Sequence, residues 1–192
     1  LTHTYPSNRG REAFREAVAS FYARRFGVTL DHDREVMPAI GAKECIFNLN
    51  LAFLDPTDVA LAADPGYPVY TGGPMLAGAE AVLMPLVPEL GFIPDLGAID
   101  AAARERARLL FVNCPNNPTG AVVPDGFFEQ LVEFGADNDI LIVHDNAYSE
   151  IVYDGYKAPS FLATPGAKDV GIEVFSLSKG FNMTGWRCAV VV

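Results

Sequence analysis

Two short runs of this sequence are apolar at every position, and they constrain the fold more than any other feature. Residues 109–112 are Leu-Leu-Phe-Val and residues 140–143 are Ile-Leu-Ile-Val. A strand with one face in water alternates apolar and polar side chains, whereas a strand covered on both faces stays apolar throughout. We therefore expect both runs to be central strands of a sheet that carries helices on each side.

Short β-rich runs alternate with longer helical stretches over the whole chain. We predict strands at residues 36–40, 59–62, 81–84, 109–113, 140–144 and 173–176, and helices at residues 11–26, 42–54, 96–104 and 127–138. The first helix is amphipathic, because apolar residues recur in it at helical spacing. These residues are Ala13, Phe14, Ala17, Val18, Phe21 and Tyr22.

Glycine and proline clusters separate these predicted elements. The clusters at residues 65–66, 72–74 and 115–120 are spaced like loops. The alternation of elements predicts parallel strands joined by crossover helices. The expected fold is therefore a single α/β domain with three layers, α/β/α, around a mostly parallel central sheet.

The acidic composition excludes some classes of partner. The chain has 14 Lys plus Arg against 24 Asp plus Glu, a formal net charge of −10, which argues against a nucleic-acid-binding groove. Half of the 192 residues are hydrophobic, which is enough for one domain with a sizeable core. No run is long and apolar enough to span a membrane, and no signal-peptide pattern is present, so we expect a cytoplasmic protein.

The cysteines and the two ends of the sequence add two expectations. Cys45, Cys114 and Cys188 are far apart and lack metal-ligand spacing, so we predict neither a disulfide nor a metal site. The sequence starts at Leu1 rather than at a methionine and stops within an apolar run at residues 190–192. We therefore expect a piece of a longer chain.

Polar residues follow two of the predicted central strands. In an open parallel sheet the carboxyl ends of the strands share one edge, so side chains there converge on one crevice. Asn117 lies in the rigid turn at residues 115–120, and Asp145 and Tyr148 follow the next strand. Taken singly, each has a commoner explanation: an asparagine bonded to its own turn, an aspartate cap, and a tyrosine at the edge of the core.

Lys179 follows the last predicted strand, between hydroxyl residues and a glycine in a mostly apolar stretch. Most lysines are solvated surface residues, but a buried lysine loses its proton more readily and becomes a nucleophilic amine. Arg187, eight residues later, supplies a permanent charge for a phosphate or a carboxylate. We therefore expect Lys179 to be a buried, reactive residue.

Two further turns belong to the same edge of the predicted sheet. Gly41, Ala42 and Lys43 form a small turn whose backbone N–H groups could face an anion at a helix N-terminus, although a plain strand-to-helix turn would have the same sequence. Tyr67 offers an aromatic ring there, and an ordinary packing role is equally compatible with it.

Three motifs, taken together and in this order, resemble those of the class I and II aminotransferases, which are pyridoxal-phosphate (PLP) enzymes of fold type I. The motifs are Pro-Asn-Asn-Pro-Thr-Gly at residues 115–120, His-Asp-Asn-Ala-Tyr at residues 144–148, and Ser-Leu-Ser-Lys at residues 176–179 followed by Arg187. The likeness runs from Tyr5 to Arg187 and implies that residues 1–192 are the large PLP-binding domain, without the N-terminal arm and the C-terminal small domain. Residues 41–44, 64–70 and 181–187 look most like the LL-diaminopimelate and alanine aminotransferase branch.

The resemblance also implies roles for the residues that would hold the cofactor ring. Lys179 would bind PLP covalently and, once freed by the substrate amine, move a proton at the substrate Cα. Asp145 would pair with the pyridine nitrogen and keep it protonated. Tyr148 and Asn117 would bond the ring 3′-oxygen, and Tyr67 would stack on the ring.

The phosphate of the cofactor would be held by a second set of residues. The resemblance assigns this role to Arg187, to Ser176, and to the turn of Gly41, Ala42 and Lys43. In the family a tyrosine at the position of Tyr5 reaches the phosphate of the neighbouring subunit. A homodimer with shared sites is therefore implied.

Three functions are compatible with the resemblance. The leading one is a transaminase that moves an amino group between an amino acid and a 2-oxo acid. The alternatives are a lyase or decarboxylase of the same fold type and a PLP-sensing aminotransferase-like domain of a transcription regulator. The sequence departs from the family at Gly180, where a small hydroxyl residue is usual, and at Cys188-Ala189, where an aliphatic residue and glycine are usual. Neither departure touches the implied chemistry, and the arginine that grips the substrate carboxylate is expected outside this chain.

Overall fold

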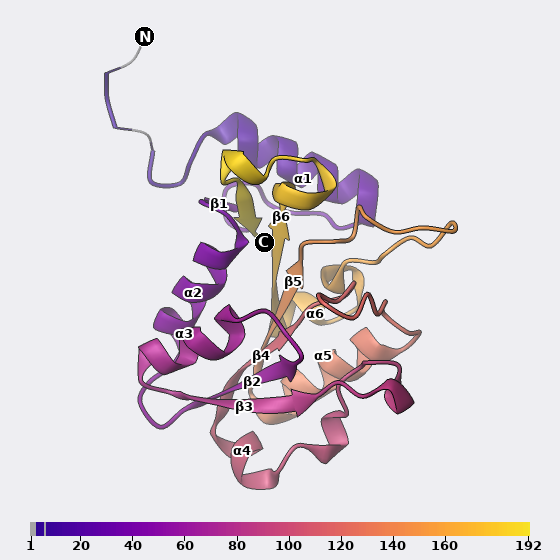
Figure 1. Ribbon diagram of the computed structural model, residues 1–192. Coiled ribbons are helices and arrows are strands. Elements are labelled where there is room, and N and C mark those ends of the chain that lie inside the picture. The colour runs from indigo at the N-terminus through magenta and orange to yellow at the C-terminus, as the bar shows by residue number, and fades with distance from the viewer. Residues whose placement is uncertain (1–2, 6) are drawn as a thin grey trace.

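A seven-stranded sheet forms the centre of the computed structural model, which describes residues 3–5 and 7–192 (Figure 1). Its strand order is β1-β7-β6-β5-β4-β2-β3. Only β7 runs antiparallel to its neighbours, β1 and β6, and the other pairs are parallel. The strands are β1 (Met37–Ala39), β2 (Val59–Asp64), β3 (Glu80–Pro85), β4 (Ala107–Val112), β5 (Leu141–Asn146), β6 (Gly171–Ser176) and β7 (Ala189–Val191). The mostly parallel sheet predicted from the sequence is confirmed.

Helices cover both faces of this sheet, as the apolar runs predicted (Figure 1). The helices are α1 (Glu12–Phe26), α2 (Ala42–Phe53), α3 (Val69–Ala77), α4 (Ala101–Arg106), α5 (Phe127–Asn138), α6 (Ala167–Val170) and α7 (Leu177–Gly180). Short 3₁₀ turns occur at Pro88–Leu90, Leu96–Ala98, Phe161–Ala163 and Thr184–Trp186. Residues of α2 and α3 pack on one face, and residues of α1, α5 and α6 pack on the other.

Strand β4 shows why its sequence is apolar throughout. Leu110 and Val112 belong to the buried cluster that includes α1 and α5, whereas Leu109 and Phe111 belong to the cluster that includes α2 and α3. Successive side chains of a strand point to opposite faces, so both faces of β4 are in contact with helices. All four side chains are 0–2 % exposed.

The prediction that residues 72–74 form a loop is wrong, because they lie inside α3. Gly73 is buried against Asn50 of α2, where a Cβ atom would collide with the Asn50 amide. Pro74 is accommodated within the last turns of the helix, which ends at Gly78 in the left-handed conformation. The glycine therefore permits close helix packing here, and the cluster does not interrupt the chain.

Several predicted boundaries also differ from the structure, and two of them change where residues lie in the fold. The helix predicted at residues 96–104 is divided, because Asp95 bonds the backbone N–H of Gly97 and Asp100 bonds those of Ala102 and Ala103, so that α4 starts afresh at Ala101. Strand β5 continues beyond residue 144 to Asn146. Asp145 therefore lies within the strand.

The first helix buries the expected aromatic and aliphatic face only in part. Val18 and Tyr22 are buried, while Ala13 and Ala17 are exposed. Arg15 is buried as well, and its guanidinium bonds backbone carbonyls and Asp33 at 2.7 Å. No helix in the described part of the chain is long and apolar enough to cross a membrane.

Candidate active site

A cavity of about 270 Å³ lies at the carboxyl ends of β4, β5 and β6. It is the crevice expected at this edge of a parallel sheet. Nine residues singled out from the sequence line it: Ala42, Lys43, Tyr67, Asn117, Asp145, Tyr148, Ser176, Lys179 and Arg187. Gly41 directly precedes α2 beside the cavity, whereas Tyr5 lies in the N-terminal segment and is 98 % exposed.

Asp145 is the buried carboxylate of this cavity. Its Oδ2 accepts a hydrogen bond from the Tyr70 hydroxyl at 2.7 Å, and its Oδ1 is buried without a partner among the described residues. Burial raises the pKa of Asp145 to about 6, while the Tyr70 hydrogen bond and the charge of His144 act in the opposite direction. One carboxylate oxygen is therefore fixed and the other is free to accept a donor from a ligand.

Tyr70, which the sequence reasoning missed, fixes the orientation of this carboxylate. Its ring is 1 % exposed and stacks on Phe111 of β4 with centroids 5.3 Å apart. Burial, together with the charge of Asp145, raises the pKa of Tyr70 well above its ordinary value, so the hydroxyl remains a donor. Tyr70 lies near the start of α3, three positions after Tyr67, in a stretch for which the sequence predicted no helix.

The turn after β4 is tied to β5 by Asn113, another residue that the sequence reasoning did not select. Its side-chain amide donates to the Asp145 carbonyl at 2.7 Å, and its side-chain oxygen accepts from the Asn117 N–H at 2.7 Å. These two hydrogen bonds of the Asn113 side chain fix Asn117 next to Tyr148. Burial raises the pKa of the Tyr148 hydroxyl, with Asp145 and Tyr67 adding to the shift and Asn117 opposing it.

Lys179 lies on the short helix α7, at the mouth of the cavity. The expectation that it is buried is wrong for the described chain, because its side chain is exposed. The buried residues of the motif are Ser176 and Ser178, and the Ser176 hydroxyl accepts from the Ser178 N–H at 3.2 Å to start the turn. The Thr184 hydroxyl donates to the Ser178 carbonyl at 2.9 Å. These bonds hold the backbone that carries the lysine.

Gly180, which departs from the family pattern, has a local explanation. A Cβ atom at this position would lie 2.5 Å from the Glu150 side chain. Glu150 is held there by Arg25 of α1, with Nε and Oε1 2.8 Å apart. The glycine therefore makes room for this ion pair.

Arg187 and the start of α2 form a cationic corner of the cavity. Gly41 has φ +91°, and a Cβ atom there would collide with the Arg187 guanidinium. Helix α2 has no side-chain cap, so the first N–H groups of the helix remain available for an anion. Lys43 adds a third basic group to the cavity and lies over the Tyr67 ring, 5.2 Å from its centroid. In a chain of formal charge −10, this corner is locally basic.

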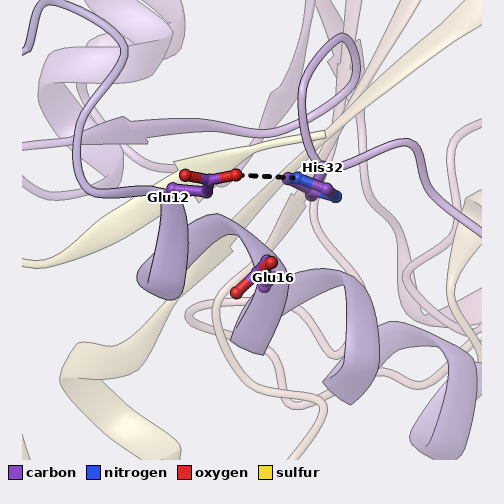
Figure 2. A group of neighbouring side chains, drawn as sticks. All are labelled: Glu12, Glu16 and His32. Atoms are coloured by element: carbon purple, nitrogen blue, oxygen red, sulfur yellow. Dashed lines mark ion pairs between the residues drawn. The ribbon is translucent and has the colours of Figure 1, made fainter.

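A separate group of titratable side chains lies away from the cavity (Figure 2). Glu12 and Glu16 of α1 and His32 have potential ligand atoms within 4.8 Å of one another, and His32 Nε2 is 3.9 Å from Glu12 Oε1. Both glutamates are exposed, and exposed acidic groups often gather without an ion. We assign no metal to this group.

Comparisons with known proteins agree with the geometry of the cavity. The sequence profile of the family Aminotransferase class I and II matches residues 1–192. LL-diaminopimelate aminotransferase of Moorella thermoacetica is 56 % identical over 185 residues, which are 96 % of this chain and 47 % of that protein. The corresponding enzyme of Gloeobacter violaceus is 53 % identical over 192 residues, which are 100 % of this chain and 49 % of that protein.

Solved structures lead to the same family. Substrate-bound BacF of Bacillus subtilis has a TM-score of 0.96 and 44 % identity, covering 99 % of this chain and 48 % of that one. An aminotransferase of Staphylococcus aureus has a TM-score of 0.94 and 37 % identity, covering 98 % and 50 % of the two chains. The chain thus spans about half the length of the relatives it matches. It belongs to the class I and II aminotransferase family.

Proposed function

We propose that residues 1–192 are the PLP-binding large domain of an aminotransferase that moves an amino group between an amino acid and a 2-oxo acid, with LL-diaminopimelate as the amino donor. Relatives that carry this name match nearly the whole chain at 49–56 % identity. They favour transamination over the lyase, decarboxylase and regulator alternatives.

The observation that carries the proposal is the unpartnered oxygen of Asp145. A buried polar atom without a partner is costly unless a ligand satisfies it. Asp145 lines the same cavity as Lys179, and a protonated pyridine nitrogen is a donor suited to its Oδ1 atom. When bound, PLP supplies an electron sink for the electrons left at the substrate Cα. Asp145 would keep the ring nitrogen protonated for that purpose.

The other residues of the cavity would bind and orient the cofactor. Tyr67 would cover one face of the ring, and Tyr148 with Asn117 would hold its 3′-oxygen. The Lys179 amine would anchor the cofactor covalently and then carry a proton to and from the substrate Cα. Its exposed position at the mouth of the cavity supports this role, because the same amine must meet both cofactor and substrate.

The basic corner would bind the phosphate group. Arg187 offers the charge, Ser176 a hydroxyl, and the backbone of Ala42 and Lys43 the N–H groups of a helix N-terminus. Gly41 leaves the space that the guanidinium occupies. Tyr5 would reach the phosphate of a neighbouring subunit in a homodimer, which its full exposure supports.

The test is borohydride reduction of the full-length protein with PLP, followed by peptide mass mapping. We expect a pyridoxyl group on Lys179 and none in the Lys179→Ala control, since reduction makes the covalent link permanent. A pyridoxyl group on another residue, or its absence although PLP is bound, would refute the assignment of Lys179.

A second measurement separates the reactions. After addition of LL-diaminopimelate alone, a transaminase converts bound PLP to pyridoxamine phosphate. Release of carbon dioxide or ammonia instead would identify a decarboxylase or a lyase.

A further inference from the structure

A fully buried carboxylate lies behind the cavity, on the far face of the sheet. Glu173 of β6 has no exposed surface and accepts five hydrogen bonds. The donors are the Tyr22 hydroxyl (2.7 Å), the Asn146 amide (2.9 Å), the Ser160 hydroxyl (2.8 Å), the Phe161 N–H (2.9 Å) and His144 Nδ1 (2.9 Å). Five hydrogen-bond donors around one carboxyl group favour the ionised form of Glu173. Although burial alone raises the pKa of Glu173, the hydrogen bond and charge of His144 and the hydrogen bonds from Asn146 and Tyr22 leave this pKa lowered.

His144 lies between two acceptors. Its Nδ1 faces the Glu173 carboxylate, and its Nε2 is 3.1 Å from the Cys114 carbonyl, an oxygen that can only accept. The His144 ring is 0 % exposed and packs against Phe128 in a T-shaped arrangement, with the ring centroids 5.1 Å apart. Solvent therefore supplies no alternative donor from that side. The Glu173 carboxylate and the Cys114 carbonyl both receive a hydrogen bond from the ring only if both ring nitrogens carry protons.

The strand geometry places this pair directly behind Asp145. His144 and Glu173 are register partners on β5 and β6, so their side chains share one face of the sheet. Asp145, the next residue on β5, points to the opposite face and into the cavity. The charge of His144 is one of the influences that hold the pKa of Asp145 down against its burial.

The remaining titratable groups around His144 are neutral. Burial raises the pKa of the Cys114 thiol to about 12, and burial with the Glu173 charge raises that of Tyr22 well above its ordinary value. On the cavity side, Tyr70 is likewise protonated. Glu173 is therefore the counter-ion of His144, and the charge of His144 also acts on Asp145, whose side chain lies on the other face.

We propose that His144 is a buried imidazolium, paired with Glu173, and that it acts through the strand as a positioning residue that keeps Asp145 ionised for a cationic ring nitrogen in the cavity. The identity of that ring as PLP rests on the proposed function. The protonation of His144 does not, because it follows from the hydrogen-bond partners alone.

The first test concerns the protonation state and needs no cofactor. Two-bond ¹H–¹⁵N spectra of the ¹⁵N-labelled full-length protein distinguish an imidazolium, with a proton on each ring nitrogen, from a neutral ring. The His144 signals are assigned by their loss in a His144→Gln/Glu173→Gln double variant, and those of the other histidines are removed by substitutions such as His3→Gln and His32→Gln. At about pH 7.5 we expect protons on both nitrogens of His144. A neutral ring there would overturn the proposal, whether or not PLP binds.

The second test measures PLP affinity against pH in a His144→Gln variant, which removes the imidazolium and leaves the Glu173 side chain in place. Loss of the positive charge lets Asp145 take up a proton at higher pH, so the acid-side midpoint of PLP binding should rise by about one pH unit. Tyr22→Phe is the matched control: it removes one hydrogen bond from Glu173 but leaves both charges, and its midpoint should stay at the wild-type value. An unchanged midpoint in the His144→Gln variant would contradict the proposal.

These outcomes separate the two ideas. If the wild-type protein does not bind PLP, the proposed function is refuted. The protonation state of His144 is then still tested by the ¹H–¹⁵N spectrum. A double variant that fails to fold leaves the decision to the wild-type spectrum, whose signals are then assigned by substitution of the other histidines.

Discussion

Asp145 is a buried carboxyl group, and its burial makes the stability of the cofactor-free protein depend on pH. Burial raises the pKa of this carboxyl from 3.8 to about 6. The neutral form is therefore favoured in the folded state, and its contribution is complete below the unfolded pKa and lost as the pH rises through the folded value. The shift corresponds to roughly 3 kcal/mol at neutral pH.

We expect Asp145→Asn to stabilise the cofactor-free protein by up to about 3 kcal/mol at pH near 7.5 and to have little effect near pH 4. The asparagine keeps an acceptor for Tyr70 and removes the buried charge. Urea unfolding at the two pH values measures the difference. Asp137→Asn, on the exposed side of α5, is the control and should change neither value. Equal effects of Asp145→Asn at both pH values would contradict the assigned burial penalty.

Single residues of the cavity could be predicted where chemistry and chain position coincide. Asp145, Asn117 and Ser176 lie at or just beyond strand ends, and strands were recognisable from their apolar runs. Tyr70 could not be recognised, since its partner Asp145 is 75 positions away and no local pattern joins them. The burial of Lys179 was wrongly predicted, because the serines beside it take the inward positions and leave the amine at the surface.

At the scale of elements, α3 depends on two adjacent glycines with different neighbours. A Cβ atom at Gly73 would collide with Asn50 of α2, whereas one at Gly72 would meet nothing within 4 Å. We expect Gly72→Ala to stabilise the protein by about 0.5–1 kcal/mol, because alanine loses less backbone entropy in a helix. We expect Gly73→Ala to destabilise it by about 1–3 kcal/mol through overpacking. Chemical denaturation of both full-length variants tests this, and destabilisation of equal size at the two positions would refute the packing argument.

Elements with a regular pattern were predicted well, and those set by tertiary contact were not. Helix α5 has the predicted bounds, residues 127–138, because its periodicity alone determines them. Helix α3 has glycine and proline where a helix normally avoids them, and only its packing on α2 explains their presence. The strand order and the reversed direction of β7 have no local signal either, since they follow from how distant segments pair.

At the scale of the whole molecule, the proposed homodimer predicts that one subunit completes the site of the other. We expect Tyr5→Phe to weaken PLP binding about tenfold, the loss of one hydrogen bond to a charged group. Mixing Tyr5→Phe with Lys179→Ala subunits should restore wild-type affinity in one site of each heterodimer, which then has both Lys179 and Tyr5. Fluorescence titration with PLP measures this.

The control for the mixing experiment is Tyr153→Phe, a change in another exposed tyrosine, which should leave PLP affinity unaltered. If heterodimers form and still bind PLP no better than Tyr5→Phe alone, the tyrosine acts within its own subunit or not at all.

The reversed strand β7 sets a limit on how the sequence between β6 and β7 can vary. Because β7 runs opposite to β6, the chain leaves the sheet after Ser176 and re-enters it at Ala189, at the same edge, and this single excursion carries both Lys179 and Arg187. The distance between the two basic groups is therefore set by one continuous chain segment rather than by separate helices or strands. An insertion or deletion anywhere between them would change the separation of amine and guanidinium, so the length of this excursion is constrained as strictly as the identity of the two residues.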